Sequence, residues 1–196
     1  MTIRKIIVLT LASTFFAFAV FGLVQEPKAR DAAATSAEAQ AAEPTPHHLA
    51  IQALAGVWDS EVEFVADPSA PMKSRGVETI RPCGDLWVVG DLEADFMGAP
   101  FRGHWVAGFD AKKGKHVGVW VDSMGDFLTT SEGTCEAKCA KIRSEMSMPD
   151  PATGLPTKFR EIAEQPNADT RTFQMFAVSP EGKETLWMKG TYRRRK

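Results

Sequence analysis

A series of short segments with alternating apolar and polar residues runs from Val57 to Arg193 and constrains the fold more than any other feature. A period of two residues is typical of β-strands, not of helices. Turn signals such as Lys113-Gly114 and Pro180-Glu181-Gly182 separate the segments. We therefore predict strands over Val57–Val65, Ser74–Arg81, Leu86–Phe96, Phe101–Asp110, Lys115–Ser123, Phe127–Thr134, Cys139–Met148, Thr157–Glu164, Thr170–Val178 and Glu184–Arg193.

Consecutive strands without intervening helices predict an all-β fold, an antiparallel up-and-down barrel of about ten strands. Gly56 would let the chain turn tightly into the first strand, and Trp58 would plug the barrel floor with a large apolar body. Thr45 and Pro46 have the pattern of an N-cap followed by a first helical residue. We expect a short helix over Pro46–Leu54, lying against the barrel mouth or floor.

The N-terminal part of the chain differs in composition from the barrel. Arg4 and Lys5 precede an uncharged, mostly apolar run over Ile6–Val24, which predicts a cleaved signal peptide or a retained membrane anchor. Both alternatives predict export, to the periplasm or beyond the cell. Residues 25–45 are rich in alanine and poor in large apolar residues, which is typical of a disordered linker. The barrel domain is expected over residues 46–196.

The overall charge gives no support for nucleic-acid binding. The formal net charge is -2, and the basic residues are spread along the chain except in Arg193-Arg194-Arg195-Lys196. Binding to a phosphate backbone normally requires a basic face. We interpret the basic end as a solvated strand terminus, and we expect contact with a membrane only through the N-terminal segment.

Several motifs resemble a known family in order over about residues 47–194. They are Leu54-Ala55-Gly56-Val57-Trp58, Gly108-Phe109-Asp110, Trp120-Val121-Asp122-Ser123-Met124, Glu132-Gly133-Thr134, Asp150-Pro151-Ala152-Thr153-Gly154 and Thr191-Tyr192-Arg193. They are similar to a bacterial exported family of unassigned function, domain-of-unknown-function family 1579. More broadly the chain resembles the calycin superfamily, which includes lipocalins. That resemblance implies that a late arginine, Arg193 or Arg195, stacks over Trp58.

Five residues are candidates for binding a ligand inside the barrel: Glu78, Trp120, Asp122, Gln174 and Tyr192. Glu78 shares a strand face with Ile80, so its carboxylate points either inward toward a ligand or outward to solvent. Asp122 either lines the interior with Trp120 or caps the turn that follows it.

The histidines and cysteines offer few metal-binding patterns. His104 and His116 lie too far apart along their hairpin to share a metal ion, and we expect both at the surface or the barrel mouth. His47 and His48 are adjacent on the expected helix and so face different ways. We predict no metal site and no cofactor.

Cys135 and Cys139 flank a short loop between two strands, which predicts a disulfide in an oxidising compartment. A redox or metal site at these two cysteines is the alternative, and Cys83 is left over.

Two classes of function remain. The first is a non-enzymatic barrel that binds a small, partly apolar molecule. The second is an isomerase or hydrolase that uses Asp122, Glu78 or a histidine as its base, although no nucleophile elbow of the Gly-x-Ser-x-Gly type occurs in the sequence. A structural or interaction module with a filled core is a further alternative. The oligomeric state is not predicted.

Overall fold

The computed structural model describes residues 42–65, 67, 69–150 and 153–196. The predicted signal or anchor over residues 1–24, and the predicted linker up to residue 41, lie outside the described residues. No helix within the described residues is long and apolar enough to cross a membrane.

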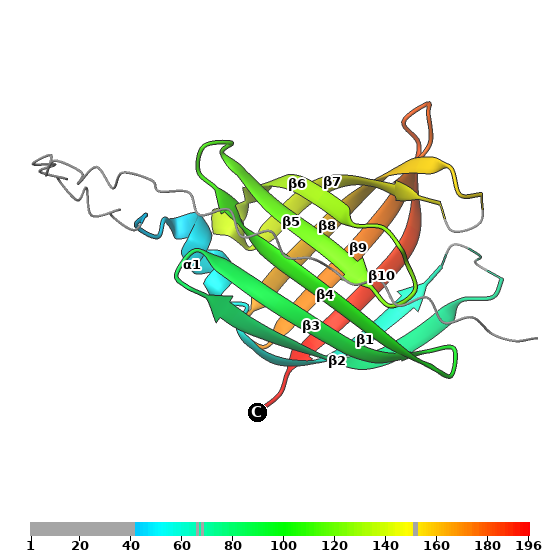
Figure 1. Cartoon of the computed structure of the whole chain (residues 1–196), viewed down its shortest axis with the longest axis horizontal. Helices are drawn as coiled ribbons and strands as arrows, with labels where there is room; N and C mark the ends of the chain where they lie inside the picture. The colour runs from blue at the N-terminus through cyan, green and yellow to red at the C-terminus, as the bar shows by residue number, and fades with distance from the viewer. Residues whose placement is uncertain (1–41, 66, 68, 151–152) are drawn as a thin grey trace, which may run out of the picture. The chain divides into compact units, whose positions relative to one another are not determined.

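Ten antiparallel strands close into one barrel, in which each strand pairs with the next and β10 pairs with β1 (Figure 1). This confirms the predicted all-β barrel. The elements are α1 (Pro46–Gln52), β1 (Gly56–Phe64), β2 (Met72–Cys83), β3 (Trp87–Phe96), β4 (Ala99–Asp110), β5 (Lys115–Asp122), β6 (Thr129–Glu136), η1 (Ala137–Cys139), β7 (Lys141–Pro149), β8 (Pro156–Asn167), β9 (Thr170–Val178) and β10 (Glu184–Arg194).

The short helix α1 lies at one end of the barrel (Figure 1). Ile51 of α1 is buried and packs in one apolar cluster with Trp58, Ile80 and Val88. His48 makes two polar contacts. Its Nδ1 accepts a hydrogen bond from the backbone N–H of Thr45 at the start of the helix, at 3.0 Å, and its Nε2 lies 3.0 Å from the Phe109 carbonyl oxygen of β4. The predicted helix is confirmed in place but ends at Gln52 instead of Leu54.

The register of the strands decides which residues face the interior. Paired residues lie on the same face of a sheet, and alternate residues lie on opposite faces. Fully buried Trp58 pairs with Glu78 on β2, and Glu78 pairs with Leu92 on β3. The same alternation places Phe159 and Glu161 of β8 inside. The inward face of each strand is therefore fixed by a buried residue on it or on its neighbour.

Candidate functional site

Glu78 is a buried carboxylate in the barrel interior. It is 4% exposed, lies on β2 beside Trp58, and is held from two sides. The indole Nε1 of Trp105 donates a hydrogen bond to its Oε1 at 2.8 Å, and the guanidinium of Arg171 on β9 forms an ion pair with its Oε2. Of the two orientations that the sequence left open for Glu78, the structure has the inward one.

Arg171 and Arg194 enclose Trp58 with their guanidinium groups. The Arg171 Cζ lies 4.4 Å from the centre of the Trp58 ring and 4.6 Å from that of Tyr192. The Arg194 Cζ lies 4.2 Å from the Trp58 ring. Such stacking places cationic charge over the negative face of each ring. Burial also raises the pKa of Tyr192 above its ordinary value, so its hydroxyl stays protonated.

The arginine over Trp58 corrects the expectation that Arg193 or Arg195 would stack there. Arg193 is exposed and pairs in register with Asp59 on the outer face. Arg195 binds the Asp59 carboxylate, its Nε lying 2.7 Å from Oδ1. The side chain of Arg194 points inward, and its Nη2 also donates a hydrogen bond to the carbonyl of Ala53 at 2.9 Å. Alternation along β10 gives the reason, since only every second arginine can reach Trp58.

A second part of the interior is reached by solvent. The inward side chains of Phe101, Trp105, Trp120, Ser131, Ser144 and Glu161 are half-buried, although they face into the closed barrel. Their partial exposure shows that protein atoms do not fully cover these inward side chains. This surface extends over β4, β5, β6, β7 and β8, and we call these six residues the open interior surface.

Glycines determine how the indole rings lie on this surface. A Cβ at Gly90 would overlap the Trp105 ring, and a Cβ at Gly103 would overlap the Trp120 ring. Each tryptophan therefore lies flat over a glycine on the neighbouring strand. The rings therefore line the wall of the barrel.

Glu161 is the carboxyl group of the open interior surface. It pairs in register with Ser144 on β7 and Met175 on β9, and the side chains of both residues point inward. Burial raises its pKa to about 7, because the ionised form loses hydration inside the barrel. Near neutral pH the carboxyl can therefore donate or accept a hydrogen bond.

Trp120 and Asp122 lie on one inward face of β5, with Asp122 at the strand end. The Asp122 Oδ2 accepts a hydrogen bond from the Trp120 Nε1 at 2.8 Å. Its Oδ1 accepts bonds from the backbone N–H groups of Met124 at 2.8 Å and Gly125 at 2.9 Å. Asp122 thus caps the turn and fixes Trp120. The two interpretations from the sequence, a turn cap and an interior residue beside Trp120, each describe it in part.

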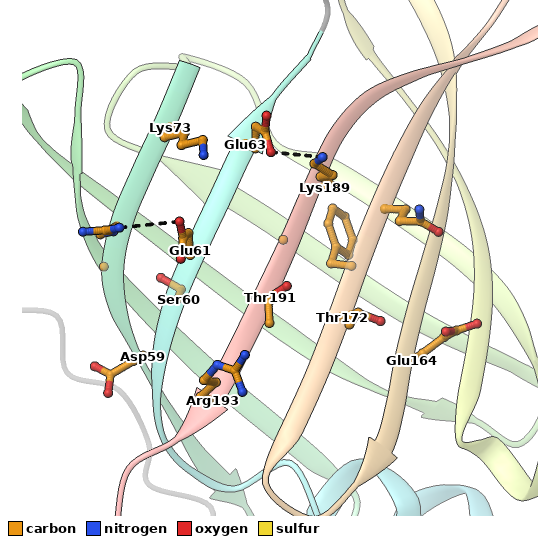
Figure 2. Close-up of a pocket in the computed structure, with 15 residues that line it drawn as sticks. Asp59, Ser60, Glu61, Glu63, Lys73, Glu164, Thr172, Lys189, Thr191 and Arg193 are labelled. Carbon is orange, nitrogen blue, oxygen red and sulfur yellow. Dashed lines mark ion pairs between the residues drawn. The ribbon is translucent and has the colours of Figure 1, made fainter. Parts of the chain in front are cut away.

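Gln174 does not face the interior, which corrects its place among the candidate ligand-binding residues. It is exposed and pairs with Lys189, whose side chain meets Glu63 on the outer wall. Figure 2 shows the groove that Gln174 borders, over β2, β1, β10, β9 and β8. Ion pairs cross it from Glu63 to Lys189 at 3.0 Å and from Glu61 to Arg75 at 3.6 Å. These charged groups neutralise one another and leave the groove without a distinctive recognition feature.

A cluster of two histidines and two cysteines lies at the end of the barrel that carries α1. It consists of His47 of α1, His116 of β5, Cys135 of β6 and Cys139 of η1, and we call it the His–Cys cluster. Cys135 and Cys139 are joined by a disulfide. The imidazole of His47 stacks on Phe109 with a centroid distance of 4.1 Å. His116 is buried beside these groups, and burial lowers its pKa to about 4.

His116 and the cysteine loop differ from the sequence-based expectations. His116 is 5% exposed and contacts His47, whereas a surface or mouth position was expected. The reason is that His47 of α1 and Phe109 of β4 pack against its imidazole ring. Cys139 lies in η1 and not on a strand, and the β-sheet partner of Cys135 is Ile142. His104 is exposed and pairs with Asp91 at 2.6 Å, and Cys83 is free and exposed.

Sequence reasoning missed Arg171, Trp105 and Glu161. Glu161 could have been noticed, because it is a charged residue in phase with apolar Phe159 and Ala163 on one strand face. Arg171 and Trp105 had no such signal, since their role depends on Glu78, which lies far away in the sequence.

Comparison with known proteins places the chain in a family. The model of the family described as protein of unknown function (DUF1579) matches residues 43–194. The chain belongs to the DUF1579 family. No curated protein sequence matches the chain.

Two solved structures resemble this DUF1579 protein in fold. The crystal structure of Rv2717c from M. tuberculosis has a TM-score of 0.60 at 13% identity, and the match covers 79% of this chain and 100% of that one. The S-type phycobiliprotein lyase CPES from Guillardia theta has a TM-score of 0.50 at 11% identity, covering 78% and 99%. At such identities the likeness concerns the fold alone.

Proposed function

We propose that this DUF1579 protein binds a small, partly apolar molecule inside its barrel. The observation that carries the proposal is the open interior surface, where inward aromatic side chains remain accessible in a closed barrel. Binding sites for small molecules are concave and mostly apolar, with a few placed polar groups. Trp105, Trp120 and Phe101 supply the apolar part here, and Ser131, Ser144 and Glu161 supply the polar part.

The chemistry of the interior indicates which molecules it suits. Flat indole rings favour a planar or aromatic body that stacks on them. The Glu161 carboxyl, with its pKa at about 7, can donate to a carbonyl or carboxylate when protonated and can accept from an N–H or O–H group when ionised. The expected ligand therefore combines a flat apolar body with one hydrogen-bonding group.

Glu78 and Asp122 were the two carboxylates considered as catalytic bases. Their contacts favour a binding function of the protein over a catalytic one. Both oxygens of Glu78 are engaged, one by Trp105 and one by Arg171. Both oxygens of Asp122 accept hydrogen bonds as well. A general base needs a lone pair within reach of the substrate proton. These two groups hold the barrel wall, which leaves Glu161 as the interior carboxyl for ligand contact.

The proposed location of the protein is outside the cytoplasm. The support is the charged start and apolar run at the N-terminus, followed by the alanine-rich stretch. N-terminal sequencing of the protein recovered from its host tests this, because residues before Val24 are absent after cleavage and present in an anchored form. Recovery of the intact chain in the cytoplasmic fraction would overturn the proposal.

A fluorescent probe of the interior tests the binding proposal. We choose 1-anilinonaphthalene-8-sulfonate, an aromatic anion whose emission rises in apolar surroundings. The test compares Ser131→Trp, which adds bulk to the open interior surface, with Thr130→Trp, which adds the same bulk on the exposed outer face of β6. We expect saturable binding that Ser131→Trp weakens at least about tenfold and Thr130→Trp leaves unchanged.

Two results would contradict the proposal. One is equal probe affinity in the two variants, which places the probe outside the barrel. The other is an absence of saturable binding in the unmodified chain, combined with native mass spectra of host-purified protein that show no bound molecule. A copurifying molecule lost in Ser131→Trp and kept in Thr130→Trp would support the proposal and identify the ligand.

A further inference from the structure

The His–Cys cluster brings four metal-ligating side chains together from three separate parts of the chain. His47 comes from α1, His116 from β5, and Cys135 and Cys139 from the β6–β7 connection. One donor atom of each lies within 4.8 Å of all the others. Two nitrogen and two sulfur donors are a common ligand set of structural zinc sites.

Four of the six distances between these atoms lie close to the edges of a zinc tetrahedron. With Zn–N of about 2.0–2.1 Å and Zn–S of about 2.3 Å, a tetrahedron has N–N edges of about 3.3 Å and N–S edges of about 3.5 Å. The His47 Nδ1 lies 3.3 Å from the His116 Nε2. The N–S distances are 3.4 Å from His47 to Cys135, 3.2 Å from His47 to Cys139, and 3.7 Å from His116 to Cys139.

The sulfur–sulfur edge differs from that of a zinc tetrahedron. Cys135 and Cys139 are covalently bonded, whereas two thiolates on one zinc ion lie about 3.8 Å apart. A disulfide sulfur carries no thiolate charge and is not a zinc ligand. Reduction would therefore change one edge of the cluster and leave the positions of both imidazoles as they are.

The charges of the cluster also fit a divalent cation. Two thiolates with two neutral imidazoles carry a charge of about -2, which one Zn²⁺ ion neutralises. His116 is buried, and its Nδ1 has no hydrogen-bond partner among the described residues. The imidazole of His47 is stacked on Phe109 and directed at the sulfurs, so no large rotation is needed for it to bind an ion.

We propose that reduction of the Cys135–Cys139 disulfide converts the His–Cys cluster into a Zn²⁺ site with His47 Nδ1, His116 Nε2 and the two cysteine thiolates as ligands. A dithiol reductant supplies the two electrons: its own two thiols form a disulfide while the Cys135–Cys139 bond breaks to give two thiols. Both cysteine protons are released when zinc binds. The disulfide and the metal-bound state exclude each other.

The consequence for the fold is a metal link between α1 and the barrel. In the disulfide form, His47 holds the helix to the barrel only through stacking and weak polar contacts. In the zinc form, the same residue would be bonded through the ion to β5, β6 and η1. This inference does not depend on a ligand in the barrel interior, because the His–Cys cluster and the open interior surface share no residue.

Cobalt binding to the full chain, prepared without a polyhistidine tag, tests the proposal. The chain is reduced with a phosphine under anaerobic conditions and titrated with Co²⁺, followed by Zn²⁺. We expect one Co²⁺ per chain, with the visible bands of a tetrahedral ion and a thiolate-to-metal charge-transfer band in the near ultraviolet. Zinc should displace the cobalt, and the oxidised chain should show neither band.

Variants assign the ligands. His47→Ala, His116→Ala and Cys139→Ser should each weaken metal binding by more than about 100-fold, beyond the usual effect of changes around a site. His104→Ala and Cys83→Ser remove an exposed histidine and the free thiol, and should bind like the unmodified chain. His47 is only half-buried, so His47→Ala is expected to fold. If circular dichroism shows that His116→Ala is unfolded, the metal affinity of His47→Ala tests the histidine ligands.

Three outcomes would overturn the proposal. The first is a reduced chain without a charge-transfer band at one equivalent of Co²⁺. The second is a band of equal strength in His47→Ala, which would show that His47 is not a ligand of the ion. The third is equal metal binding by the oxidised and reduced forms.

Discussion

Arg171 forms a buried ion pair with Glu78, although 93 positions of sequence separate them. Their side chains are 12% and 6% exposed, so bulk water hydrates neither charge to a large extent. Trp105 occupies the other carboxylate oxygen, and Trp58 and Tyr192 lie against the guanidinium. The pair thus links β2 to β9 across the interior and fixes the aromatic side chains around it.

Removal of Glu78 tests the energetic role of this pair. Glu78→Ala leaves a buried guanidinium without its counter-charge, which typically costs about 3–5 kcal/mol of unfolding free energy. Glu61→Ala removes an exposed pair with Arg75 and should cost at most about 1 kcal/mol. Urea denaturation monitored by tryptophan fluorescence measures both. Equal midpoints for the two variants would show that the Glu78 charge is not buried in solution.

The double variant Glu78→Leu with Arg171→Leu separates charge from packing. Replacing both members of a buried pair by apolar groups is often nearly neutral. We therefore expect the double variant to be more stable than Glu78→Ala alone. A double variant that is less stable would mean that the stacking of Arg171 on Trp58 and Tyr192 contributes more than the ion pair.

The sequence predicted the strands well and the interior network poorly, for a physical reason. Strand positions follow from local alternation and turn residues, so the ends of β3, β4 and β5 were predicted within about two residues. Which face of a strand is inside depends on its partners, and that requires the register of the whole barrel. Gln174 was placed inside and Glu161 overlooked for this reason.

The His–Cys cluster could not be predicted from the sequence for a different reason. The relative position of His47 and His116 depends on how α1 covers the end of the barrel, and no local pattern encodes that contact. The cysteines were recognised as a pair because they are neighbours in sequence. The imidazoles that complete the cluster are 69 positions apart.

Gly90→Ala tests whether glycine sets the position of Trp105. A Cβ at Gly90 would overlap the indole ring, so the ring must move or the strands must separate. We expect a loss of about 1–3 kcal/mol in unfolding free energy and an altered near-ultraviolet circular dichroism spectrum. Gly118→Ala is the control, since its Cβ would meet only the Ser131 Oγ at 3.1 Å and the Val106 oxygen at 3.6 Å. Identical effects in both variants would contradict the close approach of Trp105.

Glu161 gives the stability of the protein a specific pH dependence. Its pKa is about 7 in the folded chain, against an ordinary value of 4.5, so the folded state holds the proton more tightly. Unfolding then releases protons between pH 4.5 and 7, and stability falls as pH rises through this range. The loss is complete above pH 7 and amounts to at most about 3 kcal/mol.

Comparison with Glu161→Gln isolates this contribution. His116, whose pKa is lowered to about 4, acts in the opposite sense, because the unfolded chain binds its proton more tightly and stability rises with pH between about 4 and 6.5. The His116 contribution is common to both chains and cancels in their difference. The difference in unfolding free energy should therefore favour Glu161→Gln increasingly from pH 4.5 to 7. A difference that does not change with pH would contradict the burial of Glu161.

Arg194→Ala tests the contact that joins the last strand to the start of the domain. Arg194 stacks on Trp58 and donates hydrogen bonds to the carbonyls of Ala53 and Ala55, which follow α1. Arg194 also donates through Nε to the Ala168 carbonyl at 2.9 Å. Loss of a stacked cation and these three charge-assisted hydrogen bonds should cost about 2–4 kcal/mol. Arg193→Ala removes the same charge from the neighbouring exposed position and should change stability by less than about 0.5 kcal/mol. Hydrogen exchange localises the effect: in Arg194→Ala the amides of Ala53, Leu54 and Ala55 should exchange faster, while those of β5 and β6 keep their protection. If Arg193→Ala has the larger effect, Arg193 and not Arg194 closes the barrel floor over Trp58.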